Sequence, residues 1–573
     1  MKSNKIFLSI VCVGAFLFSS CTDFLKEEPK SSLPAETFFS SKALVEAAVN
    51  NLYRNALTNW TSPGVYNGNN FMMGGWSSGL FDNLVYKGQE FYIEYAQKFE
   101  MTPNNVDTKM STLWNDPYTY GISRANAVIT ILPDIDLINA GMTEDDRERY
   151  IAEARFFRAY NYLWLVRHFG NVPLMLKPQT AADDLNVPRT DAKTIYEQVI
   201  IPDLQKAIEI LPVKAQYNNS GRISAIVASA VLIDACVQMA GYPIQDATKW
   251  TMAAVEAKKF LPGGAYATEH SLCINEDFEE LSAYNQFRSV GVQSASPGGR
   301  RTTTCSEFIY IHEFKSGDAN AGFSQNAWPT AVNGLGSSEC IPLTNNAYKP
   351  MPRYLAMYDT INVRDLRMKD RQYFAKYFDK KDGSRLYNPE DNTPTPYFYY
   401  DWGAVKVQNS SGRHFAYYRL AEMYLFAAEI IAQTDGVTTQ AIDALATIRA
   451  RAYEWGYTKE EIDAGKPKSD IVAELTGLSK EQFIEQVWLE RFRELVFEFK
   501  DWNLIQRTRK YPKTHAMDAS IPVGTAQFVD ITTVGTDFST KNFSIDNLLW
   551  PIPQTQMQRN PALAPNNPGY GEN

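Results

Sequence analysis

Three glutamates near the C-terminal end of the chain have a spacing that could serve acid–base chemistry. Glu490, Glu494 and Glu498 follow one another at intervals of four residues. A glycosidase needs two carboxylates roughly 5 to 9.5 Å apart, one on each side of the bond that it cleaves. These three project in the same direction from one predicted helix, so they cannot flank a sugar. Because Arg491 and Arg493 alternate with them, the pattern favours ion pairs on a helix.

Other residue types that often carry catalysis lack a defining spacing. The five histidines are scattered with no HExxH pair, and no GxSxG is present. His168 continues an apolar helix face, which favours a core role, and Glu422 with Glu429 favours ion pairing as well. The acidic residues of segment 379–392 could hold calcium, but not at EF-hand spacing. The sequence therefore predicts no catalytic centre and no resident cofactor, and it leaves calcium open as a weak alternative.

The bulk composition is that of a large globular protein with an acidic surface. The chain has 573 residues, of which 45% are hydrophobic and 21% are charged, so disorder is excluded as its main state. Its formal net charge is −9, which argues against nucleic acid as a partner. Aromatic residues make up 13% of the chain, and most of them must lie in the core.

Helical periodicity predicts two blocks of paired helices. In the first block, residues 36–261, the pattern is strongest in 36–57, 109–132, 143–169, 191–211 and 223–240. In the second block, residues 413–508, it predicts helices over 413–432, 440–453 and 480–508. Helices of this length that are joined by short turns and rich in alanine and aromatic residues are typical of tetratricopeptide-like repeats. The fold class predicted is mainly α, a tetratricopeptide-like helical superhelix.

Two segments interrupt or end these helical blocks. Residues 262–412 are rich in Gly, Pro, Ser, Asn and Tyr, and they are too many to form one unstructured loop. We expect an ordered, loop-rich lobe inserted between the blocks and packed on them. Residues 509–573 end in a segment dense in proline, which disfavours helix and central strand. This segment should be an extended strap on the surface of the helices.

The N-terminus has the features of a secretory leader that ends at a cysteine. Lys2 and Lys5 precede an apolar run over residues 6–18, which is too short to span a membrane. Small residues then lead to Cys21, and the arrangement resembles a bacterial lipoprotein signal. We expect residues 1–20 to be removed and Cys21 to carry the lipid, with residues 21–35 as a tether. The remaining cysteines form no CxxC pair, so zinc is not expected, and their disulfide state stays open: Cys236, Cys273, Cys305 and Cys340.

Six stretches spread over the mature chain resemble the RagB/SusD family, lipidated nutrient-binding proteins of glycan-scavenging Gram-negative bacteria. They are "CTDFLKEEP" (21–29), "RANAVI" (124–129), "AEARFFRAYNYLWLVRHFGNVPL" (152–174), "YYRLAEMYLFAAE" (417–429), "ERFRELVFEFKDWNLIQR" (490–507) and "WPIPQTQMQRNPALAPNNPGY" (550–570). The resemblance implies a non-catalytic protein at the outer membrane that faces the cell exterior and binds an oligosaccharide. It also implies a SusC-like TonB-dependent barrel as partner.

Binding of a sugar requires aromatic faces for its ring and polar groups for its hydroxyls, and loops are where such residues should be sought. One candidate stretch is 59–92, where Trp76 follows two glycines that leave it little local packing, and where Asp82 and Asn83 are polar neighbours. The other is the insertion, and the resemblance implies that the ligand surface is built from these two regions. Its candidate ligand contacts are Tyr284, Arg288 and Trp328.

Two other functions stay open at this point. A secreted glycoside hydrolase would release reducing ends and would lose activity on a single carboxylate substitution. A tetratricopeptide-like scaffold that binds only protein would have no affinity for glycans. The lack of a catalytic arrangement favours the binding protein over the hydrolase.

Overall fold

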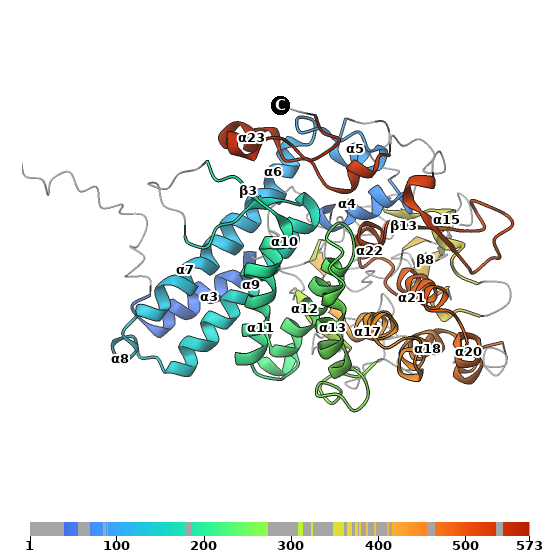
Figure 1. Cartoon of the computed structure of the whole chain (residues 1–573), viewed down its shortest axis with the longest axis horizontal. Coiled ribbons are helices and arrows are strands. Elements are labelled where there is room, and N and C mark those ends of the chain that lie inside the picture. Colours follow the sequence, from blue (N-terminus) through green and yellow to red (C-terminus); the bar gives the residue numbers. More distant parts are fainter. Residues whose placement is uncertain are drawn as a thin grey trace, which may run out of the picture.

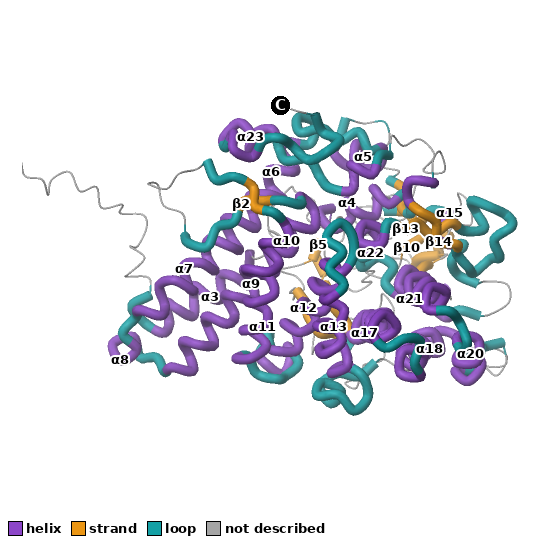
Figure 2. Tube along the Cα trace, viewed as in Figure 1, coloured by secondary structure: helices purple, strands orange, loops and turns teal. Residues whose placement is uncertain are grey.

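The protein is described from a computed structural model, in which helices predominate and strands are short (Figure 2). The described residues are 39–55, 69–83, 88, 90–178, 186–272, 307–312, 323–324, 348–359, 364–368, 373–375, 377–379, 385–387, 395–396, 410–411, 415–454, 464–534 and 543–571. Most of the predicted insertion 262–412 therefore lies outside the described residues, as do the leader, Cys21 and the tether.

The first helical block contains most of the helices that periodicity predicts. Its α-helices are α3 (Lys42–Asn55), α4 (Asn69–Ser78), α5 (Tyr92–Lys98), α6 (Asp107–Asp116), α7 (Ser123–Ile131), α8 (Leu137–Ala140), α9 (Glu144–Phe169), α10 (Ala192–Ile195), α11 (Ile201–Ile210), α12 (Ala225–Ala240) and α13 (Thr248–Ala257). Short 3₁₀ turns lie at η2 (Leu132–Asp134), η4 (Gln216–Asn219) and η5 (Lys258–Phe260).

The second block and the C-terminal segment contribute the rest. Their helices are α15 (Pro352–Leu355), α17 (Leu420–Thr434), α18 (Thr439–Tyr453), α20 (Lys468–Leu475), α21 (Lys480–Glu494), α22 (Asp501–Thr508) and α23 (Gln554–Arg559), with 3₁₀ turns η9 (Leu366–Met368), η10 (Ile531–Thr533), η12 (Ile545–Leu548) and η13 (Pro561–Leu563).

Successive helices pack side by side into a superhelix. Helix α9 packs against α7 and α11, α11 against α12, and α12 against α13; α13 then packs against α17, which also contacts α18 and α21. Figure 1 shows this progression from the blue and cyan helices through the green ones to the orange ones. The arrangement confirms the predicted tetratricopeptide-like fold, and it joins the two helical blocks through the contact between α13 and α17.

Helix α9 is the longest element and its ends follow from the sequence. Thr143 and Asp146 form a capping box at its start, where the Thr143 side chain accepts a hydrogen bond from the Asp146 amide. At its end Gly170 has φ of 70°, a conformation that favours glycine. The interior of this helix is almost entirely buried, because it packs on both sides in the superhelix.

Two predicted helices contain a wider turn that periodicity did not reveal. The predicted helix 109–132 contains the π-helical turn η1 (Pro117–Ile122), and the predicted helix 191–211 contains η3 (Tyr196–Ile200). At η1, a Cβ on Gly121 would lie 2.2 Å from Cγ of Asn161 in α9. Glycine is therefore required there for the close approach of the two helices.

The prediction that a helix begins near residue 413 is wrong for the first five described residues. Residues 415–419 form strand β12 (Phe415–Arg419), which pairs in antiparallel fashion with β4 (Phe308–His312), and helix α17 starts only at Leu420. The register pairs Tyr418 with Tyr310. A described part of the predicted insertion is thus paired with the helical block and buried in its core.

The other strands form six short antiparallel pairs among the described residues. These are β1 (Phe81–Asp82) with β6 (Lys349–Pro350), β2 (Val172–Pro173) with β3 (Arg189–Thr190), β5 (Phe323–Ser324) with β11 (Ser410–Ser411), β7 (Phe374–Ala375) with β10 (Thr395–Pro396), β8 (Tyr377–Asp379) with β9 (Arg385–Tyr387), and β13 (Lys510–Lys513) with β14 (Gln527–Asp530).

The predicted single helix 480–508 is broken into α21 and α22. Between them Phe497 and Phe499 have φ values of 65° and 59°, which a continuous helix cannot accommodate. Both rings are buried. Their burial in the core stabilises a left-handed backbone that bulky residues rarely adopt, and the break redirects the chain into α22.

The predicted strap 509–573 begins with the strand pair β13–β14, and only its last part, residues 543–571, is called the strap below; this part runs across the upper part of Figure 1 above α10 and α22. It lies on the helices as predicted, since the Trp550 amide donates to the His168 carbonyl at 2.7 Å. The expectation that proline excludes helix from this segment is wrong locally. Helix α23 fits between Pro553, at its N-cap, and Pro561, because proline is compatible with the start of a helix.

Candidate functional site

Trp76 is a core residue and not an exposed ligand platform. Its side chain is fully buried on α4, and its ring meets that of Tyr348 edge to face at 5.8 Å. The sequence predicts that Gly74 and Gly75 leave Trp76 little local packing, but these two glycines have the opposite effect. A Cβ on Gly74 would lie 2.7 Å from Cβ of Trp502, and one on Gly75 would overlap the Tyr348 hydroxyl at 1.7 Å. The glycines therefore let distant aromatic side chains approach α4, and the prediction that Trp76 faces a ligand is corrected.

The other predicted site residues are only partly described. Asn83 is fully buried, so the expectation that it contacts a ligand is corrected too. Asp82 is half-buried on β1, and its carboxylate accepts hydrogen bonds from the Asn83 amide at 2.9 Å and from the Gln97 side chain. Its role toward a ligand stays a prediction. Three predicted contacts and the predicted lipid site lie outside the described residues: Tyr284, Arg288, Trp328 and Cys21.

The glutamates that could have served catalysis form a buried ionic network, so their predicted ion pairing is confirmed. Glu490 and Glu494 are fully buried and share Arg367, which donates to them at 2.8 and 3.1 Å. Most of their partners come from distant segments and not from the same helix. Arg449 reaches Glu490 at 2.9 Å, and Arg419 reaches Glu494 at 2.7 Å. These carboxylates therefore form ion pairs with arginines in the core.

Glu422 and Glu429 are paired in the same way. Glu422 accepts from Arg491 at 2.9 Å, and Glu429 accepts from Arg507 at 2.6 Å. Burial acts to raise the pKa of Glu429, but the attraction of Arg507 and Arg491, together with hydrogen bonds from Arg507 and Trp488, lowers it overall. The Glu429 carboxylate is therefore held ionised as a structural anion.

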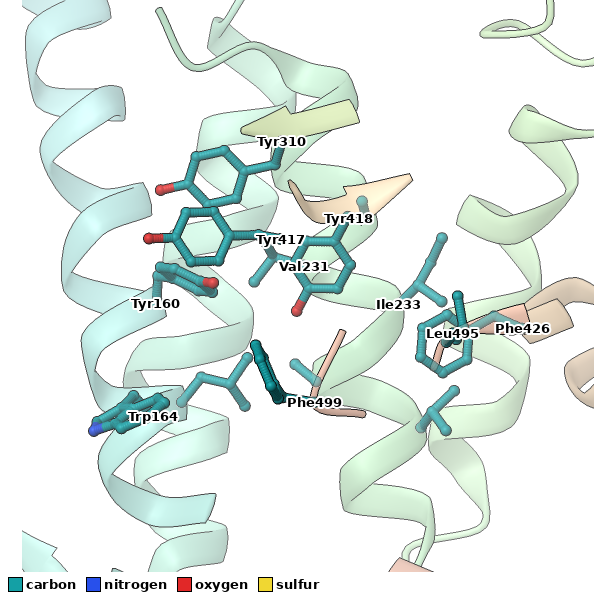
Figure 3. Packing of buried hydrophobic residues seen from close by; sticks show 14 of the residues in the cluster. Tyr160, Trp164, Val231, Ile233, Tyr310, Tyr417, Tyr418, Phe426, Leu495 and Phe499 are labelled. Carbon is teal, nitrogen blue, oxygen red and sulfur yellow. The ribbon is translucent and has the colours of Figure 1, made fainter. Parts of the chain in front are cut away.

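A small aromatic pocket lies between α9, β12 and the start of α22. Figure 3 shows the rings of Tyr160, Tyr310 and Tyr417 beside one another, with Trp164 and Phe499 below them. Its volume is only about 60 Å³, enough for a few water molecules and too small for a sugar ring. His168 lines it as a core residue, as predicted: Nδ1 bonds the Trp164 carbonyl at 2.8 Å, and burial lowers its pKa to about 3.

A larger depression, which we call the strap groove, has the size of a ligand site. Its volume is about 670 Å³, within the range of small-molecule sites. Five segments that are far apart in the sequence form its walls: the end of α9, the start of α10 with β3, the end of α12, the end of α22, and the strap. Figure 1 places these segments around α10 and α22, beneath the red strap.

The strap is fixed to these helices by hydrogen bonds. The Asn567 side chain donates to the carbonyls of Phe169 and Trp550 at 2.9 and 2.8 Å. From β3, Arg189 donates to the Asn567 side-chain oxygen at 2.9 Å. Because Phe169 belongs to α9 and Arg189 to β3, these bonds tie the strap, the outer wall of the groove, to two regular elements.

An exposed aromatic ring stands at the edge of the strap groove. Tyr242 is 41% exposed, and its amide donates to the Arg507 carbonyl at 2.8 Å. This bond needs a close approach, since a Cβ on the preceding Gly241 would lie 2.6 Å from the same carbonyl. Across the groove lies Ile545, which is 42% exposed. Two of the six large hydrophobic side chains that are exposed in the described part of the chain thus line this one depression.

Two of the side chains that line the strap groove have an oxygen without a hydrogen-bond partner among the described residues. Gln238 and Gln506 are 8% and 5% exposed, and the side-chain oxygen of each has no hydrogen-bond partner among the described residues. The Gln506 amide group is oriented by its bond to the Leu548 carbonyl. Buried polar groups are normally satisfied, so two unsatisfied acceptors in one depression indicate a place where a ligand can donate hydrogen bonds.

No metal site emerges from the described residues, since no group of three or more His, Cys, Asp or Glu side chains is arranged to hold an ion there. The calcium candidate 379–392 falls mostly outside them. Cys236 is a free, buried thiol whose pKa burial raises to about 12; Cys273, Cys305 and Cys340 lie outside the described residues. Within the described ranges, none of the helices is long and apolar enough to cross a membrane.

Sequence reasoning missed the residues of the strap groove. Tyr242 lies between the glycine that ends α12 and Pro243, and an aromatic residue in such a turn is a signal for an exposed ring that could have been noticed. Gln238, Gln506 and Arg509 carry no comparable signal. They occupy the ends of ordinary helices, and only their juxtaposition makes them a site.

Two family models match separate parts of the chain. The model described as "SusD family" matches residues 349–570. The model described as "Starch-binding associating with outer membrane" matches residues 23–233. Together they cover α9, α10, α22 and almost all of the strap, while the end of α12 lies between the two matches.

Known proteins of similar sequence and structure extend over almost the whole chain. SusD-like protein P2 of Formosa agariphila is 24% identical over 584 aligned positions, which cover 99% of each chain. A SusD superfamily protein from Parabacteroides distasonis has a TM-score of 0.71 at 22% identity, over 92% of this chain and 99% of that one. A laminarin-binding SusD-like protein has a TM-score of 0.64 at 21% identity, over 93% of this chain and 100% of that one.

Proposed function

Since this chain belongs to the SusD family, we propose that it is a non-catalytic, cell-surface protein that captures an oligosaccharide and passes it to a transporter. The observation that carries the proposal is the strap groove, a depression of about 670 Å³ with an exposed tyrosine at its edge and unsatisfied acceptors in its wall. A laminarin-binding relative with the same fold supports a glycan as the ligand.

The groove offers the two kinds of contact that a sugar needs. The Tyr242 ring can pack against the apolar face of a pyranose. The Gln238 and Gln506 oxygens can accept hydrogen bonds from its hydroxyls, and Arg509 can donate to its ring or hydroxyl oxygens. Capture by such contacts breaks no bond in the ligand.

The carboxylates support a binding role over hydrolysis. Asp191 and Asp546 are the carboxylates of the groove. Asp191 caps α10 by accepting from the Thr194 amide at 3.2 Å, and Asp546 accepts from the Ser544 hydroxyl at 3.3 Å. Each accepts a hydrogen bond at the start of its own helical turn, which gives it a structural role in the chain.

We further propose that the chain is anchored to the outer membrane through a lipid on Cys21 and that it associates with a SusC-like TonB-dependent barrel. The association with the outer membrane agrees with the description of the matching family model. Co-purification of such a barrel with the tagged chain from outer membranes would support the partnership, and recovery of the chain alone would count against it.

The Tyr242→Ala variant tests the groove as the site of capture. We expect calorimetric titration of the purified protein with a panel of plant, host and microbial oligosaccharides to find a saturable ligand without release of reducing ends. Tyr242→Ala should weaken its binding by about tenfold or more, because a stacked ring contributes on the order of 1 kcal/mol beyond its buried area. The matched control is Tyr120→Ala, since Tyr120 also lies against an arginine, at 4.7 Å from Arg124, but outside the groove.

Three outcomes of this titration are informative. If no glycan binds, glycan capture is not the function, and a scaffold that binds only protein is favoured instead. If reducing ends accumulate, the protein is a hydrolase. If binding is lost in Trp328→Ala and not in Tyr242→Ala, the site is formed by the insertion, where Tyr284, Arg288 and Trp328 are the candidate contacts; Asp82 is the remaining candidate on β1.

A further inference from the structure

The strap groove carries positive charge on a protein that is negative overall. Four basic side chains line it, Arg167, Arg189, Lys193 and Arg509, against the two carboxylates Asp191 and Asp546. The whole chain has a formal net charge of −9. Even with Arg167 paired to Asp234, the remaining basic side chains of the lining outnumber its carboxylates by three to two, which favours an anion locally.

Arg509 lies over an aromatic ring and has a guanidinium nitrogen without a hydrogen-bond partner among the described residues. It ends α22 in the left-handed conformation, with φ of 58°, and this turn carries its guanidinium over the Tyr242 ring at 5.5 Å. Its Nη1 is buried and has no hydrogen-bond partner among the described residues. Burial lowers the pKa of Arg509 in spite of the opposing influence of Tyr242 and Asp530. A guanidinium in this state gains from an anion that enters the groove.

The other basic side chains add donors from other walls of the groove. Arg189 bonds two neutral oxygens, the Asn567 side chain at 2.9 Å and the Pro565 carbonyl at 2.5 Å, and burial lowers its pKa. Arg167 is neutralised by Asp234 at 2.8 Å, but its Nε is buried and has no partner among the described residues. Lys193 is exposed at the rim, with only a loose contact of 3.9 Å to Glu197.

We propose that the strap groove selects oligosaccharides that carry a fixed negative charge, a carboxylate or a sulfate on the sugar ring. The inference rests on the proposed function of glycan capture and names the class of glycan. The planar fork of Arg509 matches the paired oxygens of either group. The sugar ring then packs on Tyr242, while Gln238 and Gln506 accept from hydroxyls that a charged sugar still carries.

Matched pairs of ligands test this preference directly. The purified full chain is titrated with an oligogalacturonide and with the same oligosaccharide after methyl esterification, and with a sulfated galactan fragment and its desulfated form. We expect one charged ligand to bind about tenfold or more tightly than its neutral partner, because a hydrogen bond to a charged group is roughly twice as strong as a neutral one. Added salt should weaken the charged ligand and leave the neutral one nearly unchanged.

Variants assign the preference to the groove. Arg509→Gln should reduce affinity for the charged ligand by about tenfold and affinity for its neutral partner by less than about threefold. Lys193→Gln, on the exposed rim, should give a smaller loss of the same sign. Lys206→Gln on α11 is the control, since it removes an exposed cation that lies outside the groove. Unchanged circular dichroism of Arg509→Gln shows that its fold is intact.

Each other result overturns the inference in a distinguishable way. If neutral sugars bind, depend on Tyr242 and gain nothing from a charge, glycan capture stands and the charge preference fails. If charged sugars are preferred but neither Arg509→Gln nor Lys193→Gln alters the preference, the groove is not its source. If no member of either pair and no other oligosaccharide binds, the proposed function itself fails together with the inference.

Discussion

At the scale of single residues, the core of this protein is unusual in how many charges it buries. Arg419 is fully buried and contacts Glu307, Glu494 and Glu498 at 2.7 to 2.8 Å. Glu307 also pairs with Arg451 at 2.7 Å and Glu494 with Arg367 at 3.1 Å, whereas Glu498 shares its arginine, Arg419, with both of them. Burial therefore outweighs the attraction of Arg419 at Glu498 and raises the pKa of this carboxyl to about 7. Removal of one partner from such a network leaves an uncompensated buried charge, which is costly.

Glu498 should make the stability of the protein fall as the pH rises. Its carboxyl has an ordinary pKa of 4.5 and a folded value of about 7, so between these values the folded state keeps a proton that the unfolded state has lost. The free energy of unfolding then decreases with pH. Between pH 5 and pH 8 the free energy of unfolding should fall by roughly 2–3 kcal/mol less in Glu498→Gln than in the parent protein. Urea unfolding of both proteins at the two pH values measures it.

The control for this prediction is Asp518→Asn. Hydrogen bonds from Ser520 lower the pKa of Asp518, so its carboxylate is ionised throughout the interval and the substitution should leave the difference between pH 5 and pH 8 unchanged. A parent protein and a Glu498→Gln variant with the same pH dependence would show that Glu498 is ionised in the folded state at pH 5.

At the scale of elements, the strap and the end of α9 depend on each other. The ring of Trp550 packs on His168 at 4.2 Å and on Phe169 at 5.8 Å, and the amide of Trp550 bonds the His168 carbonyl. Gly170, which ends α9, lies against Leu549: a Cβ there would be 2.8 Å from a methyl carbon of that side chain. The strap thus closes the last turn of the helix and forms one wall of the groove.

Trp550→Ala should detach the strap. We expect a loss of about 3–5 kcal/mol in the free energy of unfolding, since a buried Trp is replaced by a cavity. Hydrogen exchange of the amides in residues 543–571 should accelerate before global unfolding. Gln558→Ala, an exposed position on the same strap, is the control and should leave both unchanged. Equal acceleration over the whole chain would mean that the strap does not open separately.

At the scale of the whole molecule, the proposal requires a large acidic body that stays at the cell surface through one covalent attachment. Under this proposal retention depends on the lipid on Cys21, and several acyl chains are needed for stable anchoring because a single chain binds only marginally.

Cys21→Ser should therefore release the protein from the membrane. In fractionated cells we expect the parent chain in the outer-membrane pellet and the variant in the soluble fraction. Cys236→Ser is the matched control, because Cys236 is a fully buried free thiol with no role in attachment, and this variant should remain in the pellet. If the Cys21 variant also stays there, the barrel or another partner retains the chain.

Local physics explains which parts of the fold were predictable. Helices α9, α12 and α18 agree with their predicted positions within two residues, because a period of 3.6 and side-chain caps such as those of Thr143 and Ser224 are properties of neighbouring residues. Strand β12 and the break after α21 were not predictable in this way. Each depends on a partner remote in sequence: β4 for the strand, and the core that encloses Phe497 and Phe499 for the break.

The amino-acid sequence by itself determined the helical class, the ion pairing of Glu490 and its neighbours, and the resemblance that named the family. Only the tertiary structure decided that Trp76 is buried and that Tyr242 is exposed. The exposure of either ring depends on whether a distant segment covers it, and Tyr348 packs against the ring of Trp76. The tertiary structure also decided the strap groove. Side chains from five separate segments meet in this groove. Close contacts between distant residues, such as that of Gly241 with Arg507, determine the positions of the helix ends that form it. No local sequence pattern encodes such contacts.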